Sequence, residues 1–265
     1  MNTPRRSSPD PAQEPDFWEA LRRTTPARIG LGRAGSGLTT RAVLELGAAH
    51  ALARDAVHRP LDVTELQAGL AGLRHRGTAL ATPRVIASAA PDRASYLTRP
   101  DLGRTPDPDA ELGSGEDDAP TPDLAVVIAD GLSSAAVDAH AVPVLEALLG
   151  RLEAGVVLAA PVIATQARVA LGDHVGAALG ARMVLVLIGE RPGLSASDSL
   201  GAYLTWRPRP GIQDSARNCV SNIRPPHGLT YDAAAQTLAG LIAGARSLGA
   251  TGVRLKAGVR ELPGA

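Results

Sequence analysis

The spacing of apolar residues in the first part of the chain is typical of helices. Shorter helices are expected at residues 17–23 and 61–73, on either side of a longer one that Thr39 or Thr40 can cap. In the longer helix apolar residues recur at steps of three and four, which places them on one face. These residues are Val43, Leu46, Ala49, Ala53 and Val57. The first part therefore predicts a small helical domain.

Apolar runs without a polar break dominate the second part of the chain. Residues 124–129, 156–160 and 183–188 are apolar throughout, as expected for strands that are buried on both faces. Weaker strand patterns are expected at residues 85–90, 96–98, 200–205 and 253–255.

Helices are expected between these strands. Ser133 can cap one helix whose apolar residues share a face, although Pro143 should kink or split it. A short helix is expected at residues 172–180, and Thr230 can cap a last helix that Gly249 ends. Strands that alternate with helices imply a mainly parallel sheet with helices on both faces.

These elements predict an α/β protein with two ordered parts. We expect a disordered tail at residues 1–16, a small N-terminal helical domain at 17–80 and a Rossmann-like, doubly wound domain at 81–265. Residues 105–122 are expected to form a loop. In such sheets ligands bind beyond the carboxyl ends of the strands. The polar segments at those ends are residues 130–131, 161–169 and 189–193.

Composition narrows the classes of protein to which this chain can belong. Apolar residues make up 45% of the 265 residues, enough for a sizeable core, whereas aromatic residues make up only 2%, too few to stack on many bases. The 27 basic and 27 acidic residues cancel, which argues against nucleic-acid or membrane partners. No apolar run reaches the roughly 20 residues that span a bilayer, and residues 1–16 lack the apolar stretch of a signal peptide. Since Cys219 is the one cysteine, we expect a reducing compartment such as the cytoplasm.

One glycine-rich turn is similar to a dinucleotide-binding fingerprint. Residues 30–35 match the GxGxxG pattern, and Asp55 follows at a suitable distance. Such a fingerprint must follow a buried strand and open a helix whose N-terminus meets the pyrophosphate. Residues 24–29 lack a strand pattern, and Asp55 lies within a predicted helix. A structured turn is therefore favoured, and a stand-alone nucleotide- or flavin-binding α/β enzyme stays open as the alternative function.

No constellation of residues predicts a catalytic centre or a metal site in this chain. It has no GxSxG, P-loop or HExxH motif, and its six histidines lack zinc spacing. His140 lies in a predicted helix, where a surface or core role is expected, and Cys219 is most simply a small buried hydrophobic residue. Glu190 directly follows an apolar strand at the ligand-binding edge, where an ion pair with an arginine and a ligand contact are equally expected.

Several segments, in their order along the chain, resemble the small (light) subunit of ethanolamine ammonia-lyase, the EutC family. They carry the patterns TPARI, GRAG, ARDAV, YLTRPDLGR, VIADGLS, GERPGL, DSL and CVSNIRP. They lie at residues 25–29, 32–35, 53–57, 96–104, 127–133, 189–194, 198–200 and 219–225. Any one of them could arise by chance, but the ordered set is highly specific.

The resemblance implies a function as part of a larger, hetero-oligomeric enzyme. That enzyme is an adenosylcobalamin-dependent carbon–nitrogen lyase that converts ethanolamine to acetaldehyde and ammonia, with catalysis on a large TIM-barrel subunit. The small subunit helps to enclose the cobalamin, and the family's contacts fall on Val169, Glu190 and Cys219. The resemblance also implies ethanolamine catabolism, in the cytoplasm or in a bacterial microcompartment. A purely structural subunit that touches no cofactor is a third hypothesis.

Overall fold

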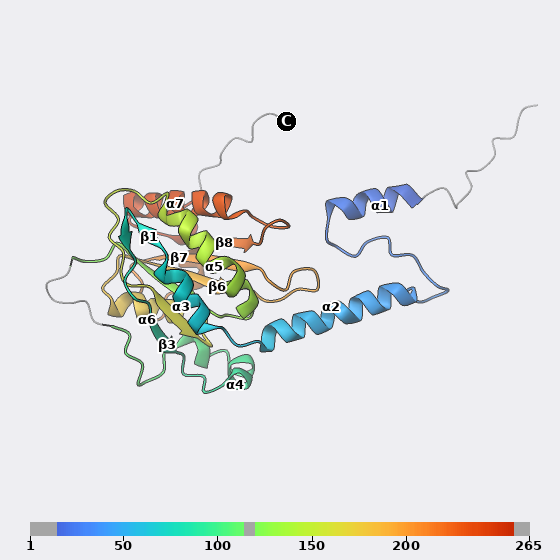
Figure 1. Cartoon of the computed structure of the whole chain (residues 1–265), viewed down its shortest axis with the longest axis horizontal. Helices are drawn as coiled ribbons and strands as arrows, with labels where there is room; N and C mark the ends of the chain where they lie inside the picture. The colour runs from blue at the N-terminus through green and yellow to red at the C-terminus, as the bar shows by residue number, and fades with distance from the viewer. Residues whose placement is uncertain (1–14, 114–119, 257–265) are drawn as a thin grey trace, which may run out of the picture.

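The computed structural model describes residues 15–113 and 120–256, and a six-stranded sheet forms its centre (Figure 1). The strands follow the order β3-β5-β4-β6-β7-β8 across the sheet. They are β3 (Arg84–Ala87), β5 (Val162–Thr165), β4 (Leu124–Ala129), β6 (Met183–Gly189), β7 (Leu200–Trp206) and β8 (Arg217–Ile223). The first four are parallel, whereas β7 and β8 each run antiparallel to their neighbours. The prediction of an α/β protein with a mostly parallel sheet is confirmed, while the Rossmann-like assignment and the domain limits stay predictions.

Helices cover both faces of this sheet, as its continuous apolar strands require. Successive residues of β4 join opposite buried clusters, with Leu124 and Val126 on one face and Ala125 and Val127 on the other. On the first face lie α3 (Val63–Ala71), α5 (Ser134–Leu149) and α7 (Tyr231–Leu248). On the second face lies α6 (Leu171–Ala178). A small hairpin of β1 (Arg74–His75) and β2 (Thr78–Ala79) follows α3.

The predicted helix ends are confirmed in three helices. The hydroxyl oxygens of Thr39, Ser133 and Thr230 each accept a hydrogen bond from the backbone N–H three residues further on, at the starts of α2 (Thr40–His58), α5 and α7. Gly249 ends α7 in the left-handed conformation with a φ of 67°, which glycine adopts without strain.

Helix α5 runs unbroken through Pro143. Of the two expected outcomes, a kink or a split, the split is therefore wrong. Proline has no N–H for the carbonyl four residues earlier, which belongs to Ala139. The hydroxyl of Tyr231 on α7 lies 3.4 Å from that carbonyl oxygen and donates to it. A neighbouring helix therefore supplies the donor that the proline lacks.

Three predicted strands are not strands in the structure. Residues 96–98 belong to α4 (Arg93–Thr98), because the carboxylate of Asp92 caps that helix. Residues 253–255 fall largely in the 3₁₀ helix η4 (Gly252–Arg254). The apolar run 156–160 also forms no strand. Within it, the backbone of Val157 hydrogen-bonds to Asp123, which directly precedes β4.

The sequence pattern missed two strands of the central sheet, β5 and β8, as well as the short strands β1 and β2. Strand β5 lies within residues 161–169, which were expected to be a polar segment beyond the end of a strand, so that expectation is wrong for residues 162–165. In β8 the buried positions are separated by pairs of partly or fully exposed ones, and Cys219, Ser221 and Asn222 are exposed. Because β8 is an edge strand with one open face, it lacks the apolar run that marks β4 and β6. Within the predicted loop 105–122, the described residues 105–113 and 120–122 form neither a helix nor a strand, and residues 114–119 lie outside the described range.

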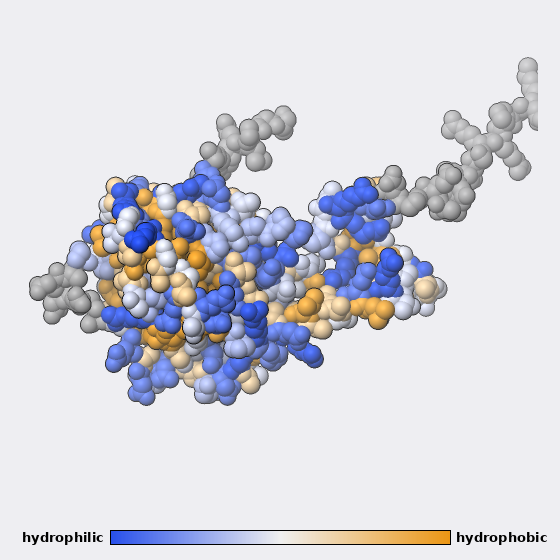
Figure 2. All heavy atoms as spheres, viewed as in Figure 1, coloured by the Kyte–Doolittle hydropathy of each residue, from blue (hydrophilic) through white to orange (hydrophobic). Residues whose placement is uncertain are grey.

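The first two helices, α1 (Pro15–Thr24) and α2, project away from the sheet and form what we term the arm (Figure 1). The predicted tail at residues 1–16 lies outside the described residues, except that Pro15 and Asp16 open α1. Of the five residues on the predicted apolar face of α2, Ala49 alone is buried. Figure 2 shows apolar side chains on the exposed surface of this arm.

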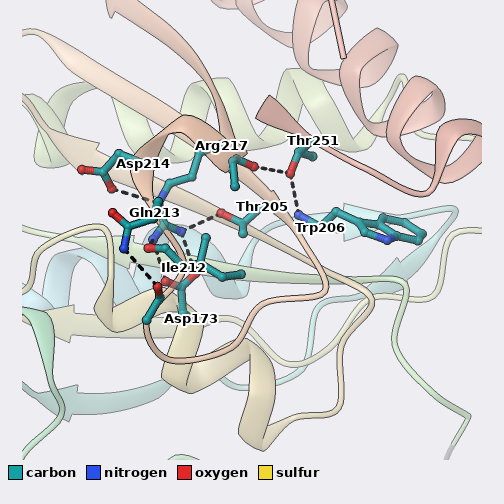
Figure 3. A network of polar contacts seen from close by, with 10 residues as sticks. Asp173, Thr205, Trp206, Ile212, Gln213, Asp214, Arg217 and Thr251 are labelled. Carbon is teal, nitrogen blue, oxygen red and sulfur yellow. Dashed lines mark hydrogen bonds and ion pairs between the residues drawn. The ribbon is translucent and has the colours of Figure 1, made fainter. Parts of the chain in front are cut away.

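A buried ion pair ties β8 to α6 (Figure 3). Arg217 donates to both carboxylate oxygens of Asp173 at 2.6 Å, and its other N–H groups reach Thr205, Asp214 and the carbonyl of Ile212. Every N–H of the guanidinium thus has an acceptor. The side chains of Arg217 and Asp173 are each 1% exposed, so removal of either partner would strand a charge in the interior.

Candidate functional site

A cleft of about 650 Å³ opens at the carboxyl ends of β4, β5 and β6. Helix α5, which follows β4, and helix α6, which follows β5, lie on opposite faces of the sheet. The chain therefore diverges between these neighbouring strands, which is where open α/β sheets bind ligands. The cleft lies at the edge that the sequence predicted.

The walls of the cleft combine apolar and charged side chains. Apolar contact comes from Leu132, Val169 and Ile188 and from the rings of Tyr96 and Tyr203. The charged residues are Arg104, Arg168, Arg191, Glu190 and Asp214. Such a surface suits a ligand with an apolar body and a polar rim.

Three hydrogen bonds hold the carboxylate of Glu190 in place. It accepts from the hydroxyl of Ser199 at 2.5 Å, from the backbone N–H of Asn222 at 3.2 Å and from the hydroxyl of Ser221. A carboxylate has roughly four acceptor positions, so one remains for a ligand. The alternative expectation, an ion pair between Glu190 and an arginine, is not met within the described part of the chain.

Tyr96 is completely buried, and its ring lies between two arginine side chains. The guanidinium carbons of Arg93 and Arg168 are 4.8 and 4.5 Å from the ring centroid, within the range of cation–π attraction. The hydroxyl donates to the carbonyl of Ala167 at 3.1 Å. Burial raises the pKa of Tyr96 above its ordinary value, so the hydroxyl remains a donor and keeps the ring in place.

Asp130 fixes the segment after β5 to the end of β4. Its buried carboxylate accepts from the backbone N–H groups of Gln166 at 2.8 Å and Ala167 at 2.9 Å, and from Arg93 at 3.0 Å. Burial raises the pKa of Asp130, and Arg93 and the N–H groups oppose that rise. These contacts set the course of the chain just before it reaches Val169.

The three predicted cofactor contacts lie near one another. Val169 and Glu190 line the cleft, and Cys219 lies on β8 opposite Tyr203 of β7, which also lines it. Cys219 is exposed, so the expectation of a buried hydrophobic residue is wrong. Partial burial of the side chain nevertheless raises the pKa of the Cys219 thiol, and the hydrogen bond with Tyr203 opposes this. The thiol is therefore neutral near pH 7.

The GxGxxG turn lacks the surroundings of a dinucleotide site. Residues 25–29 form no strand, α2 begins only at Thr40, and Asp55 lies within that helix. The indole of Trp18 packs so closely on Gly30 that a Cβ there would lie 2.4 Å from it. The segment is a structured turn, as expected, and the context that a nucleotide site needs is missing from it.

The remaining candidate residues belong to the interior or the surface. His140 is a buried residue of α5, with its Nδ1 2.9 Å from the hydroxyl of Tyr231. Within residues 15–113 and 120–256, no three His, Cys, Asp or Glu side chains gather closely enough to hold a metal ion. None of the helices in the same ranges is both long and apolar enough to cross a membrane.

Segments that carried the family resemblance contact one another in the structure. The guanidinium of Arg28 donates to the carbonyl of Leu194 at 3.1 Å, and the hydroxyl of Ser195 donates to that of Pro26. The loop that begins at Glu190 in the cleft therefore reaches the segment that joins the two helices of the arm. Two motifs that are far apart in the sequence, at residues 25–29 and 189–194, therefore lie side by side in the structure.

Sequence reasoning did not single out Tyr96, Arg93 or Arg168. Their importance depends on the fully buried ring between two cations, which no local pattern reveals. The one signal available was the position of Tyr96 within the YLTRPDLGR segment of the resemblance.

Comparison with known proteins agrees with those motifs. The profile of the ethanolamine ammonia-lyase light chain family matches residues 15–256. The chain is 51% identical over 241 residues to the ethanolamine ammonia-lyase small subunit of Rhodococcus erythropolis, which covers 91% of this chain and 90% of that protein. It is 49% identical over 271 residues to the small subunit of Azotobacter vinelandii, with 98% and 95% covered. Since these matches span nearly the whole of each chain, this chain belongs to the ethanolamine ammonia-lyase light chain family.

Proposed function

We propose that this chain is the small subunit of an adenosylcobalamin-dependent ethanolamine ammonia-lyase, which converts ethanolamine to acetaldehyde and ammonia. Family membership and relatives of the same subunit type support the reaction. In this proposal the Rossmann-like part of the chain contacts the cofactor, and a large TIM-barrel subunit carries the catalytic residues. The family favours a cytoplasmic location, either free or in a bacterial microcompartment.

The observation that carries the cofactor role is a fixed carboxylate beside apolar walls in an open cleft. The faces of a corrin ring are broad and apolar, and its rim bears amide arms that donate hydrogen bonds. Glu190 offers a charged acceptor with one position free. Leu132, Val169 and Ile188 offer apolar contact, and Cys219 is small enough for the cofactor to approach β8. These residues fit one edge of a corrinoid.

The cleft is too small to enclose cobalamin by itself. Its volume of about 650 Å³ is typical of a site that buries a drug-sized molecule, and cobalamin is much larger. A second surface must cover the rest of the cofactor. This supports a position for the cofactor between this chain and the large subunit.

The residues of this chain would bind and orient the cofactor without transferring protons. Bound adenosylcobalamin supplies the radical chemistry of the reaction. In the cleft, Asp214 forms an ion pair with Arg217 and Glu190 already accepts three hydrogen bonds. Since both carboxylates are engaged, neither is well suited to act as a general base. This supports catalysis on the large subunit.

Co-expression with a large subunit of the same enzyme tests the proposal. We expect acetaldehyde release with adenosylcobalamin to require this chain, and the complex to bind cyanocobalamin more tightly than the large subunit alone. Glu190→Ala should weaken that affinity about tenfold, as expected when a charge-assisted hydrogen bond is lost, and should leave assembly intact. Glu146→Ala, which removes an exposed carboxylate from α5, is the matched control.

Other results would redirect the assignment. Unchanged affinity in Glu190→Ala would remove that residue from the site. Normal cobalamin binding by the large subunit alone would favour a purely structural subunit. Tight binding of NAD or FMN by the isolated chain would favour a nucleotide- or flavin-binding enzyme.

A further inference from the structure

Three arginines on the cleft have no ion-pair partner. Arg104, Arg168 and Arg191 line it, and none of them pairs with a carboxylate within the described ranges. The two carboxylates of the cleft are engaged elsewhere, because Asp214 pairs with a buried arginine and Glu190 accepts three hydrogen bonds. The charge of Glu190, whose three donors are neutral, offsets only one of the three arginines, so the cleft keeps an excess of positive charge that favours an anionic ligand.

Arg168 is the most firmly held of the three. Its guanidinium lies against the Tyr96 ring, and its backbone N–H donates to the carbonyl of Gly103 at 2.8 Å. A Cβ at Gly103 would lie 2.7 Å from that ring and 3.0 Å from the Arg168 side chain, so the turn packs this closely only with glycine. The Nε of Arg168 is buried and donates to no described residue. The terminal nitrogens of the guanidinium are not among the buried atoms and hydrogen-bond to no described residue, so they can donate to an acceptor in the cleft.

Two backbone donors follow Arg168 directly. The N–H groups of Val169 and Ala170 donate to no residue that the structure describes, whereas those of Leu171 and Gly172 bond to carbonyls one turn earlier. Helix α6 begins here, so the positive end of its dipole lies at the same place. An arginine fork beside free N–H groups at a helix start is suited to a phosphate group.

We propose that Arg168, together with Arg104 and the amino end of α6, binds the phosphodiester of cobalamin's nucleotide loop. This inference rests on the proposed cofactor role. The phosphodiester is the anionic group on the periphery of cobalamin, because the arms of the corrin ring end in neutral amides. Glu190 accepts from those amides and Arg168 donates to the phosphate, so these two opposite charges together set the orientation of the cofactor.

Three corrinoids distinguish a contact with the phosphate from contacts with the rest of the cofactor. Cyanocobalamin has the complete nucleotide loop, cobinamide phosphate keeps the phosphate without the base, and cobinamide lacks both. Their affinities for the complex of this chain with the large subunit are measured by equilibrium dialysis. Arg168→Gln should weaken binding of the first two by about ten- to a hundredfold, as expected for hydrogen bonds to a charged group, and leave cobinamide unchanged. Arg168→Lys, which keeps the charge but loses the planar fork, should lie between.

Two further variants keep the test decisive. Arg74→Gln removes an exposed arginine from the β1 hairpin, outside the cleft, and should bind all three probes like the unmodified complex. Arg104→Gln alters an exposed residue, so it should assemble even if Arg168→Gln does not. It should weaken binding of the same two phosphate-bearing probes, but by a smaller factor.

An equal loss for all three probes, or no loss for any, would overturn the phosphate assignment. Binding of inorganic phosphate that Arg168→Gln abolishes, with unchanged cobalamin affinity, would also overturn it, because the subsite would then serve free phosphate. If the unmodified chain adds nothing to the cobalamin affinity of the large subunit, the cofactor role itself fails. That outcome is distinct because it does not depend on Arg168.

Discussion

The central sheet buries its apolar side chains, whereas the arm leaves several of its large apolar side chains exposed. Every residue of β4 and β6 is buried, and α5 buries residues along most of its length. In α2 the buried residues are the alanines at positions 42, 49 and 56, whereas Val43, Leu44 and Leu52 are 53%, 67% and 64% exposed. Helix α2 thus buries only alanines and leaves several of its large apolar residues exposed.

This difference indicates that the sheet completes its own core and that the arm does not. Helices that stand alone gain most of their stability from packing an apolar face on a neighbour, and exposed apolar patches mark interaction surfaces. The segment that joins its two helices also contacts the loop that starts at Glu190. We therefore expect the large subunit to cover the arm.

The largest effect is expected in the interior beside the sheet. Asp173→Ala removes the buried carboxylate of Arg217 and leaves only the exposed Asp214 as its ion-pair partner. This should lower the free energy of unfolding by about 3–5 kcal/mol in urea titrations. Glu19→Ala removes the carboxylate of an exposed ion pair on the arm and should cost at most about 1 kcal/mol.

The double variant Asp173→Leu with Arg217→Met distinguishes a stranded charge from lost packing. It removes both charges and should recover most of the stability, because buried ion pairs are often replaceable by apolar residues of similar size. A double variant as unstable as Asp173→Ala would contradict this explanation.

A smaller effect is expected from pH at His140. Burial lowers the pKa of His140, and Asp198, with its carboxylate 3.9 Å from Nε2, opposes this. Since the folded pKa lies below the unfolded value of about 6.5, the unfolded chain takes up the proton first as the pH falls. Stability is then complete above about pH 6.5 and declines as the pH drops through the unfolded pKa. His140→Gln should flatten this decline in unfolding titrations between pH 8 and 5, whereas His50→Gln, on the exposed surface of α2, should leave it unchanged.

The sequence predicted the structure best where an element depends on a single local interaction, such as burial on both faces of a strand or a capping hydrogen bond. The apolar runs of β4 and β6 are buried on both faces, and each capping hydroxyl bonds to a backbone N–H within its own helix, so local patterns were sufficient. The position of Glu190 followed from the same logic, because a polar residue directly after a buried parallel strand lies at the ligand edge.

The failures arise where neighbours distant in sequence decide the outcome. The segment around Tyr96 resembles a strand locally, yet the Asp92 cap and the two flanking arginines make it a helix that buries the ring of Tyr96. The cationic wall around Arg168 was equally hidden, because its partners come from the turn at Gly103 and from α4. The apolar face of α2 was recognised correctly as a pattern, but a pattern does not reveal whether its partner lies in the same chain.

The smallest effect on stability, and the clearest test of the arm, is expected when Leu44 and Leu52 are both replaced by Ala. Their side chains are largely exposed, so the free energy of unfolding of this chain should change by no more than about 0.5 kcal/mol for each. Association with the large subunit should weaken, because both residues lose apolar area that the partner would cover. Val253→Ala, at an apolar residue that is 80% exposed outside the arm, should alter neither quantity. Unchanged association in the double variant would mean that the arm's apolar residues face solvent even in the assembled enzyme.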